Sequence, residues 1–178
     1  MKSKAILPIL LAVALAAAGC RSSTDRSAGT VLLEVNMFNG LPITVSVATG
    51  PTQITSMTLK SIVKDPNGTT SSLQDIQMRS IEFTYTRLDN GTRVPPPLVD
   101  SIFGTVPVNG TLIINNQEFF RADQLLSPPL SDLTNFGFDQ QNGTKVIPLR
   151  VTMRFFGRTL SGDDIVSDPA SFNLDVVP

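Results

Sequence analysis

Hydrophobic and polar residues alternate with a period of two along most of the chain after residue 30. The clearest run covers 149–155, where four large apolar residues are separated by Arg150, Thr152 and Arg154. The same alternation marks five other runs: 31–37, 43–47, 57–63, 81–85 and 172–176. Such a pattern predicts strands with one buried face and one solvated face, as in antiparallel sheets.

Turn signals separate these runs. Asn-Gly pairs, which supply the positive φ angles of tight turns, occur at 39–40, 67–68, 90–91, 109–110 and 142–143. The last two runs, 146–156 and 165–177, are joined by 157–163 and predict a hairpin. This hairpin resembles the last strand pair of bacterial immunoglobulin-like domains, although the chain lacks their Cys…Trp…Cys signature. We expect a mainly β fold, an antiparallel immunoglobulin-like β-sandwich, over 31–178.

Residues 117–126 depart from the period of two. Asn115 precedes Glu118 by three residues, which is a variant of the capping box. Apolar residues then follow at helical spacing until a Ser-Pro-Pro stop: Phe119, Ala122, Leu125 and Leu126. The segment therefore predicts one short amphipathic helix, which crosses between the sheets or closes one end of the sandwich.

The first 20 residues follow the plan of a bacterial secretion signal. Lys2 and Lys4 form a basic start, and 5–18 is an apolar run interrupted by Pro8. This run is too short to span a bilayer, which takes about 20 apolar residues. The stretch 15–20, LAAAGC, resembles the lipobox of bacterial lipoproteins, with Ala17 where the consensus prefers Leu.

The lipobox resemblance implies that 1–19 is a cleaved lipoprotein signal peptide and that the Cys20 thiol carries a lipid. Two or three acyl chains hold a protein firmly on a membrane, since each buried CH₂ contributes about 0.8 kcal/mol. Arg21 stands where an Asp would retain the protein in the inner membrane, so the outer membrane is favoured in a diderm bacterium. Residues 20–30 are polar and small, and we expect a flexible tether. The alternatives are a non-lipidated signal peptide with an incidental cysteine and an uncleaved membrane anchor.

Composition excludes several kinds of chemistry. The chain has no His, no Trp and one Cys, which lies at the signal boundary. Ser-His-Asp and Cys-His sites are therefore excluded, as is a disulfide within the domain. Without Lys2 and Lys4 the mature chain carries 12 basic and 15 acidic residues. With no basic patch, we expect no nucleic-acid partner.

Carboxylates are the remaining candidates for chemistry. Asp163, Asp164 and Asp168 cluster in the loop of the last hairpin, and Asp65 and Asp89 lie beside Asn-Gly pairs. Such residues serve as Ca²⁺ ligands, as a glycosidase pair or as turn formers. Because no Asp-x-Asp-x-Asp spacing occurs, we expect turns, with no catalytic residue, no metal and no cofactor.

Two adjacent aromatic pairs suggest a contact surface. In Phe119–Phe120 and Phe155–Phe156, one ring of each pair lies outside the predicted buried stripe. Phe120 and Phe156 are the best candidates for a partner contact, unless each ring covers a seam between elements.

These observations lead us to expect a non-enzymatic envelope lipoprotein with a structural or partner-binding role. Its partners would be membrane lipid through Cys20 and an envelope protein or glycan. The alternative is a carbohydrate- or ligand-binding module on the cell envelope.

Overall fold

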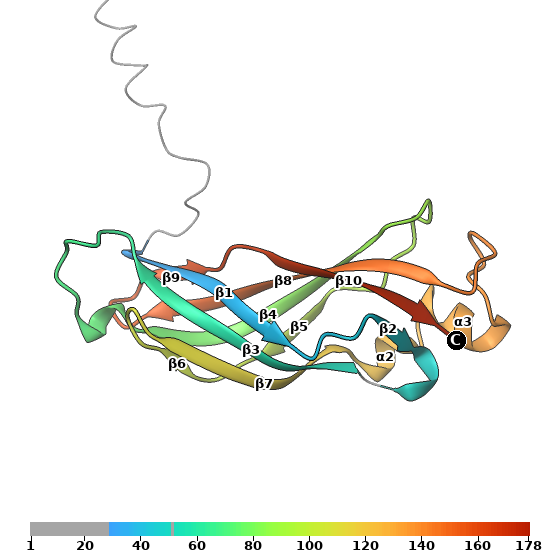
Figure 1. The fold of residues 1–178 in the computed structure, drawn as a ribbon, viewed down its shortest axis with the longest axis horizontal. Coiled ribbons are helices and arrows are strands. Elements are labelled where there is room, and N and C mark those ends of the chain that lie inside the picture. Colours follow the sequence, from blue (N-terminus) through green and yellow to red (C-terminus); the bar gives the residue numbers. More distant parts are fainter. Residues whose placement is uncertain (1–28, 51) are drawn as a thin grey trace, which may run out of the picture.

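The alternating runs form two β-sheets in the computed structural model, which describes residues 29–50 and 52–178 (Figure 1). The smaller sheet has the order β1-β3-β7, and these strands are β1 (Val31–Asn39), β3 (Thr52–Val63) and β7 (Thr111–Phe120). The larger sheet has the order β2-β10-β8-β4-β5, with β6 paired to β4 and β9 paired to β8. Its strands are β2 (Thr44–Ser46), β4 (Ile76–Arg87), β5 (Leu98–Ser101), β6 (Thr105–Val106), β8 (Ile147–Thr159), β9 (Asp164–Val166) and β10 (Ala170–Val177). The expected mainly β fold is confirmed, and all pairings are antiparallel except that of β2 with β10.

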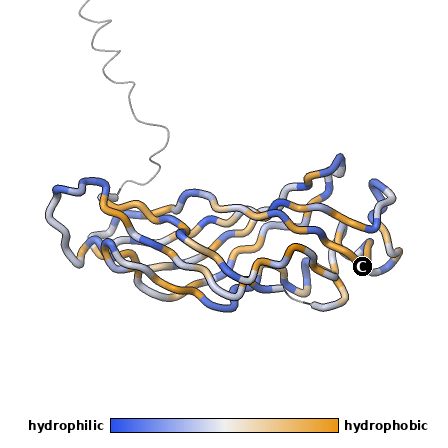
Figure 2. Tube along the Cα trace, viewed as in Figure 1, coloured by the Kyte–Doolittle hydropathy of each residue, from blue (hydrophilic) through white to orange (hydrophobic). Residues whose placement is uncertain are grey.

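The two sheets pack face to face over one hydrophobic core. Phe119 of β7 meets Phe172 of β10 edge to face, with ring centroids 5.3 Å apart, and lies 6.4 Å from Phe83 of β4. Figure 2 shows the strands alternating between hydrophobic and hydrophilic residues, while the loops at both ends are mostly hydrophilic. The apolar stripe of every long strand therefore faces the other sheet.

Strand β8 shows the alternation most clearly. The four apolar residues of its stripe are fully buried, whereas Arg150 is exposed and Thr152 and Arg154 are half-buried. The predicted final hairpin is also present: β9 pairs with the end of β8, and β10 pairs with its beginning. Between them, Ser167 donates its N–H to Phe155 O and accepts the Phe155 N–H at its Oγ. Pro169, which has no N–H to donate, lies between the end of β9 and the start of β10.

The predicted helix over 117–126 is correct only for its second half. Residues 117–120 belong to β7, because pairing with β3 satisfies their backbone groups. Helix α2 (Ala122–Leu125) begins one turn later, and the Gln124 Oε1 accepts the Arg121 N–H at its start. The capping interaction therefore involves Arg121 and Gln124 rather than Asn115 and Glu118.

The remaining helical segments were not predicted. They are α3 (Leu130–Phe136) and two single 3₁₀ turns, η1 (Val47–Thr49) and η2 (Ser72–Gln74). Within the described ranges, none of the helices combines the length and the apolar character needed to cross a membrane.

The Asn-Gly pairs turn the chain in different ways. All five pairs were expected to supply positive φ angles, and three of them do so, at Gly40, Asn109 and Gly143. The pairs at 67–68 and 90–91 have none. At Gly91 glycine is needed for another reason, a close approach to Arg87 that is described below.

Ser61 is a buried polar residue without a partner. It lies on β3, is fully buried, and its Oγ has no hydrogen bond to any residue that the structure describes. Ser61→Ala removes this unsatisfied group, so we expect the free energy of unfolding to rise by about 1 kcal/mol. Urea denaturation measures the change, and the exposed Ser171→Ala should stay within about 0.5 kcal/mol of wild type. A clear loss of stability in Ser61→Ala would show that the hydroxyl is bonded in solution.

Candidate functional site

Of the three residues proposed from the sequence, the structure describes Phe120 and Phe156. Cys20 lies outside the described residues. Phe120 is fully buried and stacks on Tyr85 with ring centroids 5.0 Å apart, so it belongs to the core and does not face a partner. The register of β3 and β7 shifts between Thr52 and Gln53, opposite the end of β7, and both adjacent rings are buried there. Phe156 is half-buried on β8, opposite Ser80 and Val166, and its role as a contact stays a prediction.

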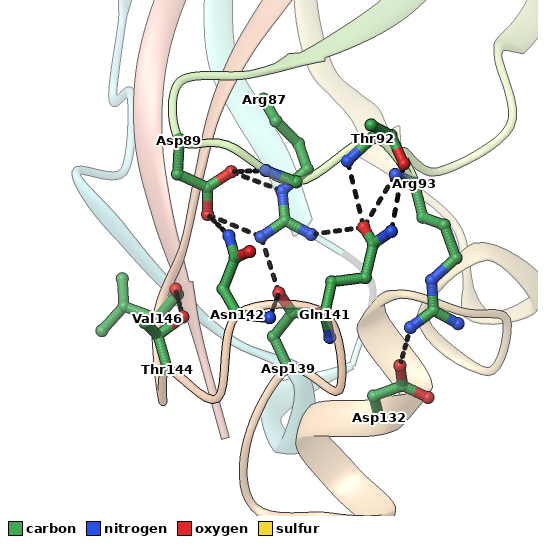
Figure 3. A network of polar contacts seen from close by, with 11 residues as sticks. Arg87, Asp89, Thr92, Arg93, Asp132, Asp139, Gln141, Asn142, Thr144 and Val146 are labelled. Carbon is green, nitrogen blue, oxygen red and sulfur yellow. Dashed lines mark hydrogen bonds and ion pairs between the residues drawn. The ribbon is translucent and has the colours of Figure 1, made fainter.

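A polar network that the sequence analysis missed lies at one end of the two sheets (Figure 3). Its centre is Arg87, the last residue of β4, whose side chain is almost completely buried. The Arg87 Nε and Nη2 donate to the two carboxylate oxygens of Asp89 at 2.6 Å each. The Nη2 also donates to Asp139 Oδ2 at 2.8 Å, and the Asp139 side chain is fully buried. One guanidinium thus pairs with two carboxylates from loops far apart in sequence.

The position of Arg87 follows from the period of two. Ile81, Phe83 and Tyr85 are buried on one face of β4, and Arg87 is the next residue on that face. This face leaves the apolar core at Arg87, where an unpaired charge would be costly. The sequence signal that could have identified the Arg87–Asp89 pair is an arginine at a position of the apolar stripe, followed two residues later by an aspartate.

The loop after α3 wraps around the Asp139 carboxylate. Backbone N–H groups of Gln141 and Asn142 donate to its two oxygens at 3.3 and 3.2 Å. The Asp139 N–H donates to Thr144 O at 2.7 Å, which closes the loop. The Asn142 Nδ2 reaches across to Asp89 Oδ2 at 3.0 Å. The carboxylate therefore organises its own loop and joins it to the loop after β4.

Gln141 fixes the loop between β4 and β5. Its Oε1 accepts the N–H groups of Thr92 and Arg93 at 3.1 and 2.9 Å, and its Nε2 donates to Thr92 Oγ1 at 3.0 Å. The Arg93 Nη2 in turn donates to Asp132 Oδ2 of α3 at 2.8 Å. As Figure 3 shows, the two loops and α3 are held together by side chains that point toward one another.

Gly91 lets the backbone pass directly over the guanidinium. A Cβ at this position would lie 2.2 Å from Arg87 Cζ, and the Gly91 N–H donates to Asp89 Oδ1 at 3.1 Å. Any larger residue would displace the loop or the arginine.

The same contacts shift the pKa values of the three charged groups. The Arg87 hydrogen bonds lower the pKa of Asp89 to about 2, against an opposing effect of burial. Burial favours neutral Asp139, yet hydrogen bonds from Arg87 and from the Gln141 N–H outweigh it and lower the pKa of Asp139. The Asp89 hydrogen bonds raise the pKa of Arg87. All three groups are therefore charged at neutral pH.

A second buried contact ties α2 to the same loop. The Tyr85 hydroxyl donates to Phe119 O and accepts from Gln124 Nε2, which also donates to Pro96 O at 2.6 Å. Burial raises the pKa of the Tyr85 hydroxyl, so it stays neutral. These bonds hold the second half of the β4–β5 connection against α2.

An open groove adjoins the network, which contributes Asp89, Gln141 and Asn142 to its lining. The other lining residues are Asn90, Thr144, Lys145, Val146, Pro148 and Asp175. Such groups can exchange hydrogen bonds with hydroxyl or peptide groups of a ligand, but they include no nucleophile paired with a base.

The aspartates of the last hairpin serve the turn and local ion pairs. Asp163 accepts from Ser161 Oγ at 3.0 Å, and Asp164 lies 3.8 Å from Arg79 and 3.7 Å from Arg158. Across residues 29–50 and 52–178, no group of three carboxylates is arranged to hold a metal ion.

Comparison of the chain with models of known families, with curated proteins and with solved structures finds no match.

Proposed function

We propose that this chain is a lipoprotein of the bacterial cell envelope, anchored through Cys20, with a non-enzymatic structural or partner-binding role. The observation that carries the proposal is the lipobox-like stretch 15–20 behind a basic and apolar start. The outer membrane is the favoured location in a diderm bacterium, because Arg21 follows the cysteine. The chemistry is transfer of a diacylglyceryl group to the Cys20 thiol, and the acyl chains of that group supply the membrane affinity.

We also propose that the domain is an immunoglobulin-like β-sandwich. Its strand order supports this: β1, β3 and β7 occupy the positions of strands A, B and E, while β4, β8 and β10 occupy those of C, F and G. Strand β5 beside β4 matches the added C′ strand of variable-type domains.

The loop end of the domain supports a partner-binding role. Arg87, Asp139 and Gln141 hold two loops and α3 in one arrangement before any ligand arrives, which lowers the entropic cost of binding. A fold alone does not specify a function, so the partner-binding role is supported by these fixed loops and not by the sandwich.

The groove beside the network favours a second candidate, a carbohydrate- or ligand-binding module. Its amides and carboxylates suit the hydroxyl groups of a glycan, although no aromatic ring lines it. Titration with soluble envelope glycan fragments, followed by NMR at Asn142 and Lys145, distinguishes this candidate from a protein-binding role.

Cys20→Ser tests the anchor. We expect the wild-type protein to remain in the membrane fraction after a high-salt wash and to incorporate labelled palmitate. The variant should lose the label, and its membrane-bound amount should fall roughly tenfold or more, because no acyl chain holds it. Ser22→Ala, two residues away, is the matched control and should behave as wild type. A Cys20→Ser protein that stays firmly membrane-bound would contradict the proposal.

A further inference from the structure

The chain enters the domain at the end opposite the Arg87 network. Gly29 packs against Ile165 of β9, and the Thr30 carbonyl accepts the Lys64 N–H at 3.0 Å. The Thr30 Oγ1 also accepts from Gln74 Nε2 of η2 at 3.0 Å. Figure 1 shows the start of β1 and strand β9 at one end of the molecule, with α3 and the C-terminus at the other. The first described residues are therefore fixed at one end of the long axis.

Two exposed leucines lie beside this entry point. Leu73 of η2 is 57% exposed and Leu160, in the turn after β8, is 46% exposed. The Ser161 N–H donates to Leu73 O at 2.8 Å, and the Leu160 N–H donates to Asp75 O at 3.0 Å. These backbone bonds hold the two loops together, so the two exposed leucines lie on adjacent loops. We call Thr30, Leu73 and Leu160 the entry surface.

Charges around the entry surface are mixed. Arg79 and Arg158 both lie near Asp164, and Asp163 accepts from Ser161. Lys64 lies next to Thr30 through the backbone bond just described. Neither sign dominates, so the surface suits the zwitterionic and weakly charged headgroup region of a membrane better than a strongly charged partner.

We propose that the entry surface rests on the lipid bilayer, with Leu73 and Leu160 inserted at the headgroup boundary. This inference rests on the proposed lipidation of Cys20. Cys20 precedes Gly29 by nine residues, which span at most about 30 Å even when fully extended. The anchor therefore keeps the entry surface at a high effective concentration near the membrane, where a weak leucine contact suffices. The same orientation directs the Arg87 network away from the bilayer.

The chain contains no Trp, so one introduced Trp reports on its own position. Leu73→Trp and the control Phe136→Trp, on the exposed end of α3, are each made in the lipidated full-length protein. The proteins are bound to vesicles of phosphatidylethanolamine and phosphatidylglycerol that carry bromine on the acyl chains. We expect the bromines to reduce Leu73→Trp emission roughly twofold or more and Phe136→Trp emission by less than about one tenth.

Vesicle flotation is measured first and separates the two proposals. A protein that does not float overturns the lipid anchor and, with it, the membrane contact. If the protein floats but the two Trp variants are quenched equally, the anchor stands and the membrane contact is wrong. Hydrogen exchange of the unsubstituted lipidated protein gives a second measurement: 72–75 and 159–162 should exchange more slowly on vesicles, and unchanged exchange would overturn the contact.

Discussion

Met153→Asp and Val151→Asp are each expected to unfold the domain, whereas Arg150→Ser and Thr152→Ser leave its stability nearly unchanged. Met153 and Val151 lie in the fully buried stripe of β8, the strand that pairs with both β4 and β10. An aspartate there would have no partner, and burying it costs several kcal/mol. Small domains are stable by only about 5–15 kcal/mol, so this loss is comparable to the whole free energy of unfolding.

The control residues lie on the opposite face of the same strand. Arg150 is exposed and makes one side-chain contact with Asn173, at 3.3 Å, so its replacement should change stability by no more than about 0.5 kcal/mol. Thermal melting followed by circular dichroism measures all four variants. Equal losses on both faces would mean that β8 is buried on both sides, and equal tolerance would mean that it is not a core strand.

Asp139→Ala is expected to destabilise the domain by about 2–4 kcal/mol, because the buried Arg87 keeps Asp89 as its charge partner but loses its charged hydrogen bond to Asp139. The substitution also leaves the backbone N–H groups of Gln141 and Asn142 without the carboxylate that accepts their hydrogen bonds. Asp164→Ala is the matched control: this carboxylate is exposed and lies more than 3.5 Å from Arg79 and Arg158, so its removal should cost less than about 1 kcal/mol. Chemical denaturation of the two variants measures the difference.

The same variant should change how stability depends on acidity. The pKa values of Asp89 and Asp139 are lower in the folded protein than in the unfolded chain. Their contribution to stability is therefore complete above about pH 4 and is lost as the pH falls toward 2. Asp139→Ala should lose less stability over this interval than wild type. If both proteins lose the same amount between pH 4 and 2, the Asp139 carboxylate does not titrate as its contacts require.

Removal of Asp139 should also disturb the 139–144 loop and the groove beside it. Once Asp139 is removed, the 139–144 loop loses the group around which it is folded, and Gln141 loses its fixed position against Thr92 and Arg93. Any ligand that binds the adjoining groove should therefore bind Asp139→Ala more weakly even under conditions where the domain remains folded.

The sequence by itself determined the strands that carry one apolar face. The stripe of β8 and the final hairpin were identified because alternation with a period of two is a local property, and each residue needs only its neighbours to reveal it. The lipobox-like stretch is local in the same sense, and its interpretation depends on no contact elsewhere in the chain.

Only the tertiary structure decided the position of residues whose contacts lie far away in the sequence. Residues 117–120 fit a helix by spacing, but β3 offers them backbone partners along a whole strand, and this pairing places Phe120 in the core. Arg87 continues an apolar stripe, and its burial depends on Asp139, which lies 52 residues away and is brought near by the pairing of β4 with β8. Such contacts are invisible in a single sequence, because the energy that selects them comes from groups that meet only after the sheets have formed.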